Sequence, residues 1–106
     1  MIDENNLSAM GGVEIAFFKL KEGCLEQDLI VLSKRVEAEF LSQQSELVAH
    51  FLLKRADGVY ADVAMASTQE KVEEYCQQWL SNAVALEYLE LLDSESVDMT
   101  FWTRIN

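Results

Sequence analysis

The single histidine of this sequence, His50, is the side chain best suited to acid–base chemistry. Its imidazole has an unperturbed pKa near neutral pH, so His50 can serve as a general base or a hydrogen-bond donor. If Asp57-Gly58 is a two-residue hairpin loop, His50 lies opposite Met65. We assign that face of the sheet to the helices, because it also carries Val63. His50 is then a candidate catalytic residue in a cavity.

Two alternatives to this role of His50 stay open. His50 can be a structural histidine near the sheet edge, since pocket residues are few in any protein. A bulge or a three-residue loop would shift the register by one position and move His50 to the other face.

An aromatic stripe on a predicted helix supplies candidate ligand contacts. Tyr75, Cys76 and Trp79 recur at helical spacing and are expected to face Phe17 and Met65. They could wall a pocket for an aromatic ligand, with the tyrosine or the tryptophan as a polar handle. The alternative is a plain hydrophobic core. The candidate ligand-binding residues are therefore Phe17, Met65, Tyr75 and Trp79.

With the same two-residue hairpin loop, a further set of polar side chains lies on the opposite face of the sheet. Carboxylates brought together can raise one another's pKa, so a second catalytic site is one interpretation. The other is a polar rim with ion pairs between two protomers. The set comprises Glu14, Arg55, Tyr60, Asp62, Asp98, Thr100, Trp102 and Arg104.

The sequence has no Gly-rich phosphate loop, no metal-ligand spacing and no serine nucleophile elbow. We therefore expect no metal, haem or nucleotide cofactor, and any catalysis would depend on the substrate's own reactivity. Cys24 and Cys76 are too few and too distant for a disulfide scaffold or a metal site, which favours a reducing cytoplasm.

The elements that would position these residues are arranged around a β-hairpin over residues 47–67, with Asp57-Gly58 at its turn. Before it, we predict a strand over 13–20 and an amphipathic helix from Cys24 to about Phe40. After it, a capping box at 67–70 begins a second helix, which Ser81-Asn82 can break. A last strand spans 97–105. Residues 1–12 are predicted to be a mobile leader and 13–106 a single domain.

This order of elements, βαββαβ, predicts a ferredoxin-like α+β fold, with a four-stranded antiparallel sheet and its helices on one face. The other face should also be apolar, and a second copy of the sheet is the simplest cover for it. We therefore predict a homodimer through the sheet face. The residues expected on that face are Ala16, Phe18, Leu20, Phe51 and Leu53.

The composition of the chain limits the classes of partner that we expect it to bind. The net charge is −11 over 106 residues, which repels nucleic acid and anionic lipid surfaces. No apolar run approaches the roughly 20 residues of a membrane span. We expect neither nucleic acid nor membrane as a partner.

The stretch Phe17-Phe18-Lys19-Leu20-Lys21-Glu22-Gly23, together with Trp79, resembles the dimeric α+β barrel superfamily, in particular its antibiotic-biosynthesis-monooxygenase-like domains. The resemblance spans about residues 13–105. It implies two sheets facing each other as a barrel, and a small apolar cavity between sheet and helices. Some members are cofactor-free oxygenases of polycyclic or quinone-like substrates, some degrade haem and many have no known activity. The haem branch combines an Asn, a Trp and a helical His, whereas this chain has no Asn on its first strand and no His on its second helix.

Two functions remain from the sequence. The first is a dimeric module that binds a small apolar or aromatic molecule. The alternative is a cofactor-free monooxygenase acting on a phenol or a quinone-like substrate. The sequence favours binding, because one histidine is nearly all that it offers for catalysis in the cavity.

Overall fold

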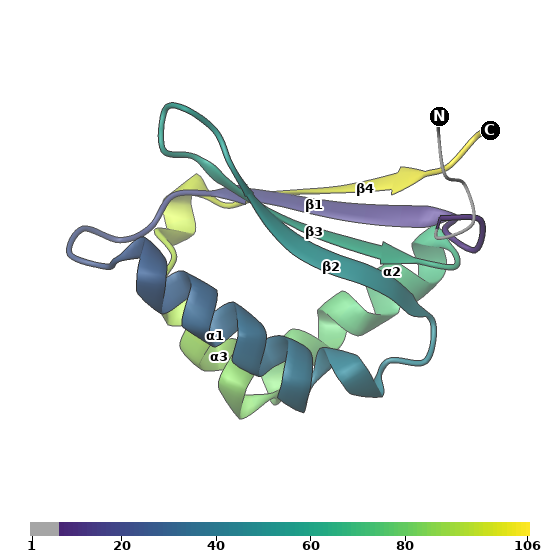
Figure 1. Cartoon of the computed structure of the whole chain (residues 1–106), viewed down its shortest axis with the longest axis horizontal. Coiled ribbons are helices and arrows are strands. Elements are labelled where there is room, and N and C mark those ends of the chain that lie inside the picture. The colour runs from purple at the N-terminus through teal and green to yellow at the C-terminus, as the bar shows by residue number, and fades with distance from the viewer. Residues whose placement is uncertain (1–6) are drawn as a thin grey trace.

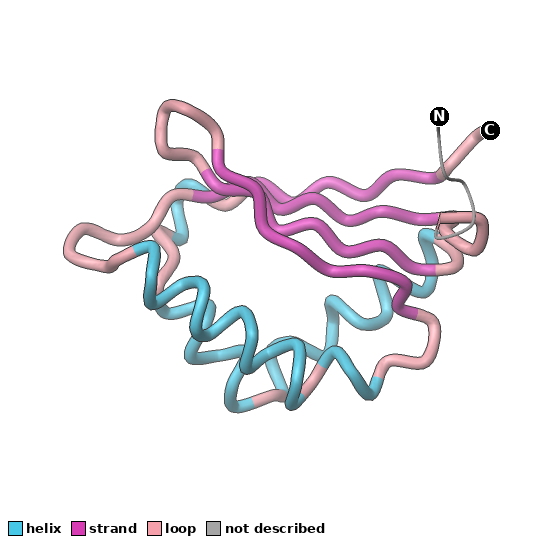
Figure 2. Tube along the Cα trace, in the orientation of Figure 1, coloured by secondary structure: helices cyan, strands magenta, loops and turns pink. Residues whose placement is uncertain are grey.

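An antiparallel sheet covered on one face by helices forms the domain (Figure 1). The computed structural model describes residues 7–106. The sheet has the strand order β2-β3-β1-β4. Its strands are β1 (Gly12–Phe18), β2 (Leu47–Lys54), β3 (Tyr60–Ala66) and β4 (Asp98–Thr103), and the helices are α1 (Glu26–Glu39), α2 (Gln69–Gln77) and α3 (Ala83–Glu90). Figure 2 shows the helices together on one side of the sheet. The predicted ferredoxin-like α+β fold is confirmed.

Side-chain caps set where α2 and α3 begin. The Thr68 hydroxyl accepts a hydrogen bond from the Lys71 amide at 3.1 Å, so α2 is capped one residue later than a capping box on Ser67 requires. The Asn82 side chain accepts from the Ala85 amide at 2.9 Å and starts α3. The predicted break at Ser81-Asn82 is therefore confirmed.

The hairpin loop has three residues, and this overturns the predicted register. Arg55 donates its amide to the Val59 carbonyl at 2.7 Å, and Gly58 closes the turn with a φ of +86°. This is the three-residue loop that ends in a left-handed glycine. His50 consequently pairs with Ala64 rather than Met65.

Successive side chains of a strand point to opposite faces of the sheet. A one-residue difference in the pairing with β2 therefore places each side chain of β3 and β1 on the face opposite to the predicted one. His50 lies on the helix side, as predicted. Phe17 and Met65 lie on the opposite face, so their predicted place in a helix-side pocket was wrong. Ala16 and Phe18 were expected on the free face but lie under the helices, where Phe18 is 1% exposed. The free face carries Val13, Ile15, Phe17, Ala61, Val63, Met65, Phe51 and Leu53.

Aromatic side chains dominate the core between sheet and helices. Phe18 stacks on Tyr60 with ring centroids 5.8 Å apart, and Trp79 meets Tyr88 edge-on at 5.2 Å. Phe40 meets Trp79 edge-on at 5.9 Å. Phe18 also meets Tyr88 edge-on at 6.3 Å, and this contact joins the aromatic cluster of the helix layer to the sheet.

The start of the domain differs slightly from the prediction. Part of the predicted leader, residues 1–6, lies outside the described residues. Within residues 7–12, the Leu7 and Met10 carbonyls accept hydrogen bonds from the Arg104 guanidinium at 2.6 and 3.1 Å, and the Gly11 amide donates to the Ala66 carbonyl at 2.9 Å. Strand β1 begins at Gly12 rather than Val13. Within residues 7–106, no helix has the length and apolar character needed to cross a membrane.

Gly12 provides a test of how closely β1 approaches α2. A Cβ at Gly12 would lie 2.2 Å from the Gln69 nitrogen, whereas a Cβ at Gly58 would meet nothing within 4 Å. We expect Gly12→Ala to lower the free energy of unfolding by about 3 kcal/mol or more, because two backbones must separate. The control Gly58→Ala should cost roughly 1–2 kcal/mol, from its positive φ alone. Urea denaturation measures both, and equal losses would show that the close approach at Gly12 is wrong.

Candidate functional site

Two carboxyl groups, Glu14 on β1 and Asp62 on β3, are buried beneath the helices, and each is 4% exposed. Glu14 pairs with Ala64 and Ala16 with Asp62, so the two acids are diagonal neighbours on one face of the sheet. Their predicted position on the opposite face was wrong, for the same reason as that of Met65. Acidic side chains are almost never fully buried without partners, so their surroundings define the candidate site.

Asp62 is held by hydrogen bonds from two elements. Its Oδ1 accepts from Nε2 of His50 at 2.8 Å, and its Oδ2 accepts from the Tyr88 hydroxyl at 2.6 Å. The other ring nitrogen of His50 lies 3.4 Å from the Glu37 carboxylate on α1, which is partly exposed. Burial disfavours a charged His50, but the hydrogen bonds and charges of Asp62 and Glu37 prevail and raise the pKa of His50 above its ordinary value. An imidazolium between two carboxylates is therefore favoured.

Glu14 has the opposite protonation. Its Oε1 accepts a hydrogen bond from the Tyr75 hydroxyl at 3.4 Å and a longer one from the Cys76 thiol at 3.6 Å. Its Oε2 is buried and has no hydrogen-bond partner among residues 7–106. Burial first, and then the negative charge of Asp62, raise the pKa of Glu14 to about 8. Glu14 is thus predominantly a neutral carboxylic acid at neutral pH.

The neighbouring hydroxyl and thiol groups are also neutral. Burial is the main cause that raises the pKa of Tyr75, Cys76 and Tyr88 well above their ordinary values. A thiol that keeps its proton is a poor nucleophile, so Cys76 acts here as a hydrogen-bond donor.

A cavity of about 230 Å³ lies against these acids. Its wall is mostly apolar, and its polar groups belong to Glu14, Asp62, Cys76 and Tyr88. The remaining lining residues are Ala16, Phe18, Trp79, Leu80, Leu89, Leu92, Val97 and Met99. An apolar cavity with a few convergent polar groups and a shifted carboxyl pKa is the usual form of a small-molecule site.

The residues proposed from the sequence are only partly brought together. Trp79 lines the cavity. Tyr75 and His50 stand one contact away, behind Glu14 and Asp62 respectively. Sequence parity noted both acids but placed them on the wrong face. A lone acid between apolar neighbours, as in the strands around Glu14 and Asp62, is the signal that could have marked them as buried.

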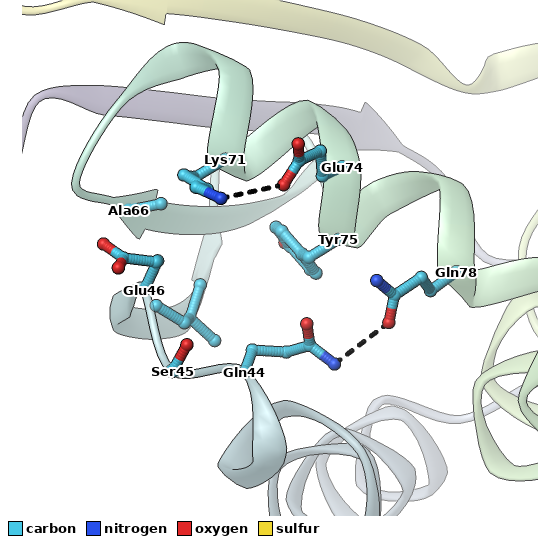
Figure 3. A pocket seen from close by; sticks show the side chains of 9 residues that line it. Gln44, Ser45, Glu46, Ala66, Lys71, Glu74, Tyr75 and Gln78 are labelled. Atoms are coloured by element: carbon cyan, nitrogen blue, oxygen red, sulfur yellow. Dashed lines mark hydrogen bonds and ion pairs between the residues drawn. The ribbon is translucent and has the colours of Figure 1, made fainter.

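A second, smaller hollow of about 90 Å³ lies between α2 and the segment that leads into β2. Figure 3 shows the side chains that line it. Its polar side chains satisfy one another: Gln44 donates to Gln78 at 3.2 Å, and Lys71 pairs with Glu74 at 3.4 Å. Tyr75 lines this hollow while its hydroxyl contacts Glu14. The larger cavity remains the candidate site. Within residues 7–106, no three His, Cys, Asp or Glu side chains are grouped so that they could hold a metal ion.

The protonated state of Glu14 predicts how stability depends on pH. The pKa of Glu14 rises from 4.5 to about 8 on folding, so the native state holds an extra proton between these values and stability falls as pH increases through them. Glu14→Gln removes this dependence. We expect the variant to match the wild type near pH 5 and to be more stable by a few kcal/mol near pH 8.

The raised pKa of His50 also makes stability fall with increasing pH, above about pH 6.5, but this contribution is common to both proteins and cancels in the difference. Urea denaturation at several pH values is the measurement. A difference between wild type and Glu14→Gln that does not change with pH would show that Glu14 is ionised in the native protein.

Comparisons with known proteins support the fold. No family model matches the sequence, and no match among curated proteins was found. Among solved structures, the chain is similar to SnoaB, a cofactor-independent oxygenase from Streptomyces nogalater, with a TM-score of 0.66 and 17% identity over 92% of this chain and 96% of that one. It is also similar to a monooxygenase from the gene ActVA-Orf6 of Streptomyces coelicolor in complex with nanaomycin D, with a TM-score of 0.72 and 13% identity over 93% and 91% of the two chains.

A third similar structure is Rv0793 from Mycobacterium tuberculosis, with a TM-score of 0.65 and 17% identity over 91% of this chain and 96% of that one. Identities this low establish a shared fold and no more. The chain therefore shares the fold of these solved structures, which agrees with the fold that the resemblance of the sequence implied.

Proposed function

We propose that the helix-side cavity binds a small hydroxylated arene and that the protein oxygenates it without a cofactor. The observation that carries this proposal is the pair of buried acids, Glu14 and Asp62, on the wall of an otherwise apolar cavity. The fold is shared with SnoaB, which is described as a cofactor-independent oxygenase. Of the two functions that the sequence left open, this proposal is the cofactor-free monooxygenase, and its substrate is the predicted aromatic ligand.

The size and lining of the cavity support an aromatic ligand of one or two fused rings. A volume of about 230 Å³ is below the roughly 300–1,000 Å³ of pockets for drug-sized ligands. The rings of Phe18, Trp79 and Tyr88 can pack against a flat molecule in stacked or edge-on geometry.

Asp62 is the group suited to receive the proton of a phenol. His50 and Tyr88 each occupy one of its oxygens, which fixes the carboxylate with a remaining lone pair for the ligand hydroxyl. The imidazolium of His50 offsets the buried negative charge. In this proposal His50 acts through Asp62, as a positioning residue, rather than touching the substrate.

The reaction is balanced with molecular oxygen as the oxidant. The phenolate is electron-rich, and oxygen attaches one of its atoms to a ring carbon that carries hydrogen. The second oxygen atom leaves as water with the ring hydrogen and the phenol proton. A quinone is the product, so the substrate has lost two hydrogens, one from the ring and one from the hydroxyl group, and gained one oxygen.

The test uses 1-naphthol as the probe. Tryptophan fluorescence in a Trp102→Phe background reports binding near Trp79, and an oxygen electrode with product absorbance reports turnover to naphthoquinone. Asp62→Asn should lower turnover by roughly 10²-fold or more, the usual yield of a general base. The matched control Asp98→Asn alters an exposed carboxylate outside the cavity and should leave turnover unchanged.

Two results would count against this function. Binding without oxygen uptake would leave a ligand-binding module, and the oxygenase proposal would be wrong. If 1-naphthol does not bind at the highest concentration that its solubility allows, the proposed arene site is also wrong.

We also propose that two copies pack through the free face of the sheet. This face is apolar over its central strands, and Phe51, Leu53 and Trp102 are 38%, 53% and 55% exposed on it. Exposed apolar surface of this kind is unfavourable in water, and a second, identical sheet covers it fully. Of the polar residues expected to form ion pairs between protomers on this face, Asp62 takes no part, because it lies buried beneath the helices.

Sedimentation velocity tests the dimer. The wild type should sediment as a dimer at micromolar concentration, and Leu53→Lys should shift it to a monomer, because a charge on the covered face must be desolvated. Leu86→Lys places the same charge on an exposed site of α3 and should leave the dimer intact. A monomeric wild type, or equal behaviour of the two variants, would contradict the interface.

A further inference from the structure

Glu14, a residue of the cavity wall, carries a buried oxygen atom without a hydrogen-bond partner among residues 7–106. The residue is 4% exposed and lines the cavity wall. One oxygen, Oε1, already accepts from Tyr75 and Cys76. The other, Oε2, is buried and unpaired within residues 7–106. Buried polar atoms nearly always have a partner, so an unpaired one on a residue of the cavity wall is a candidate contact for a polar atom of the ligand.

The surroundings of Glu14 decide whether this atom donates or accepts. The titratable groups that face it are Asp62 on β3, His50 on β2, Tyr75 and Cys76 on α2, and Tyr88 on α3. On β4 its register partner is the apolar Phe101. Burial and the charge of Asp62 keep the proton on the carboxyl group, and they prevail over the hydrogen bonds from Cys76 and Tyr75 and the charge of His50, which favour the ionised form. Because Oε1 is occupied as an acceptor, the proton resides on Oε2.

We propose that Glu14 determines ligand specificity in this cavity: its neutral carboxyl group donates a hydrogen bond from Oε2 to an acceptor oxygen of the bound arene. This inference rests on the proposed arene site, and it adds a selection rule to it. Asp62 accepts from a ligand hydroxyl, whereas Glu14 donates to a ligand oxygen. An arene with a carbonyl oxygen should therefore bind better than a hydrocarbon of the same shape.

The same donor makes the preference depend on pH. Once Glu14 loses its proton, Oε2 becomes an acceptor and repels a carbonyl oxygen. The preference for a carbonyl ligand should thus fall in alkaline solution, although the ligand itself does not titrate. An amide at this position keeps a donor and loses the titration, which separates hydrogen bonding from a structural role.

The experiment compares α-tetralone with tetralin by isothermal titration calorimetry. The two share one bicyclic frame, but only α-tetralone carries a carbonyl oxygen. The readout is the ratio of their dissociation constants, measured near pH 6 and near pH 9.5 for the wild type, Glu14→Gln and Glu14→Leu. Circular dichroism checks that each protein stays folded under each condition, and Asp98→Asn is the control.

Near pH 6, Glu14→Leu should reduce the preference for α-tetralone by roughly five- to tenfold relative to the wild type, as expected for loss of one hydrogen bond. The wild type should lose a similar factor between about pH 6 and about pH 9.5. Glu14→Gln should retain its preference at both pH values, and Asp98→Asn should behave as the wild type.

Two results overturn the inference in distinguishable ways. If both compounds bind but the ratio is unaffected by Glu14→Leu or by pH, the donor role of Glu14 is wrong and the arene site stands. If α-tetralone, tetralin and 1-naphthol all fail to bind, the arene site is wrong and the role of Glu14 falls with it.

Discussion

The burial of two carboxyl groups under the helices is the constraint on which the rest of the site depends. Transfer of an ionised carboxylate into a low-dielectric interior is costly unless it is paired and hydrogen-bonded. Hydrogen bonds from His50 on β2 and from Tyr88 on α3 stabilise the Asp62 carboxylate. Glu14 avoids the cost by keeping its proton. The site thus holds an acceptor and a donor side by side, and each is stabilised by a different physical means.

The order of elements and the two-layer fold could be predicted from the sequence, because hydrophobic periodicity and turn residues are local signals. The strand faces could not, since they depend on whether the loop at Asp57-Gly58 has two or three residues. Both loops suit an Asp-Gly pair. The structure shows the longer one, with Arg55 bonded to Val59 and Gly58 at positive φ, and this single residue reversed the faces of β3 and β1.

In the candidate site too, the residues that could be predicted are those marked by a local signal in the sequence. Trp79 could be assigned to the cavity because helical periodicity within one segment fixes which side of a helix faces the sheet. Glu14 and Asp62 were visible as acids in apolar strands, but their partners lie far away along the chain and come together only through the register. His50 was placed on the correct side of the sheet, yet it contacts Asp62 rather than the cavity. Asp62 lies between His50 and the cavity, and this depends on the pairing of β2 with β3, which the sequence does not determine.

The central claim is that Glu14 keeps its proton at neutral pH beside the buried Asp62 in the folded protein. It is tested most directly by a 13C NMR titration of the side-chain carboxyl carbons, with Glu14→Gln and Asp62→Asn used to assign the two signals. We predict that the Glu14 resonance titrates with a midpoint near pH 8. A Glu14 resonance that titrates near its ordinary value of 4.5 would contradict the claim.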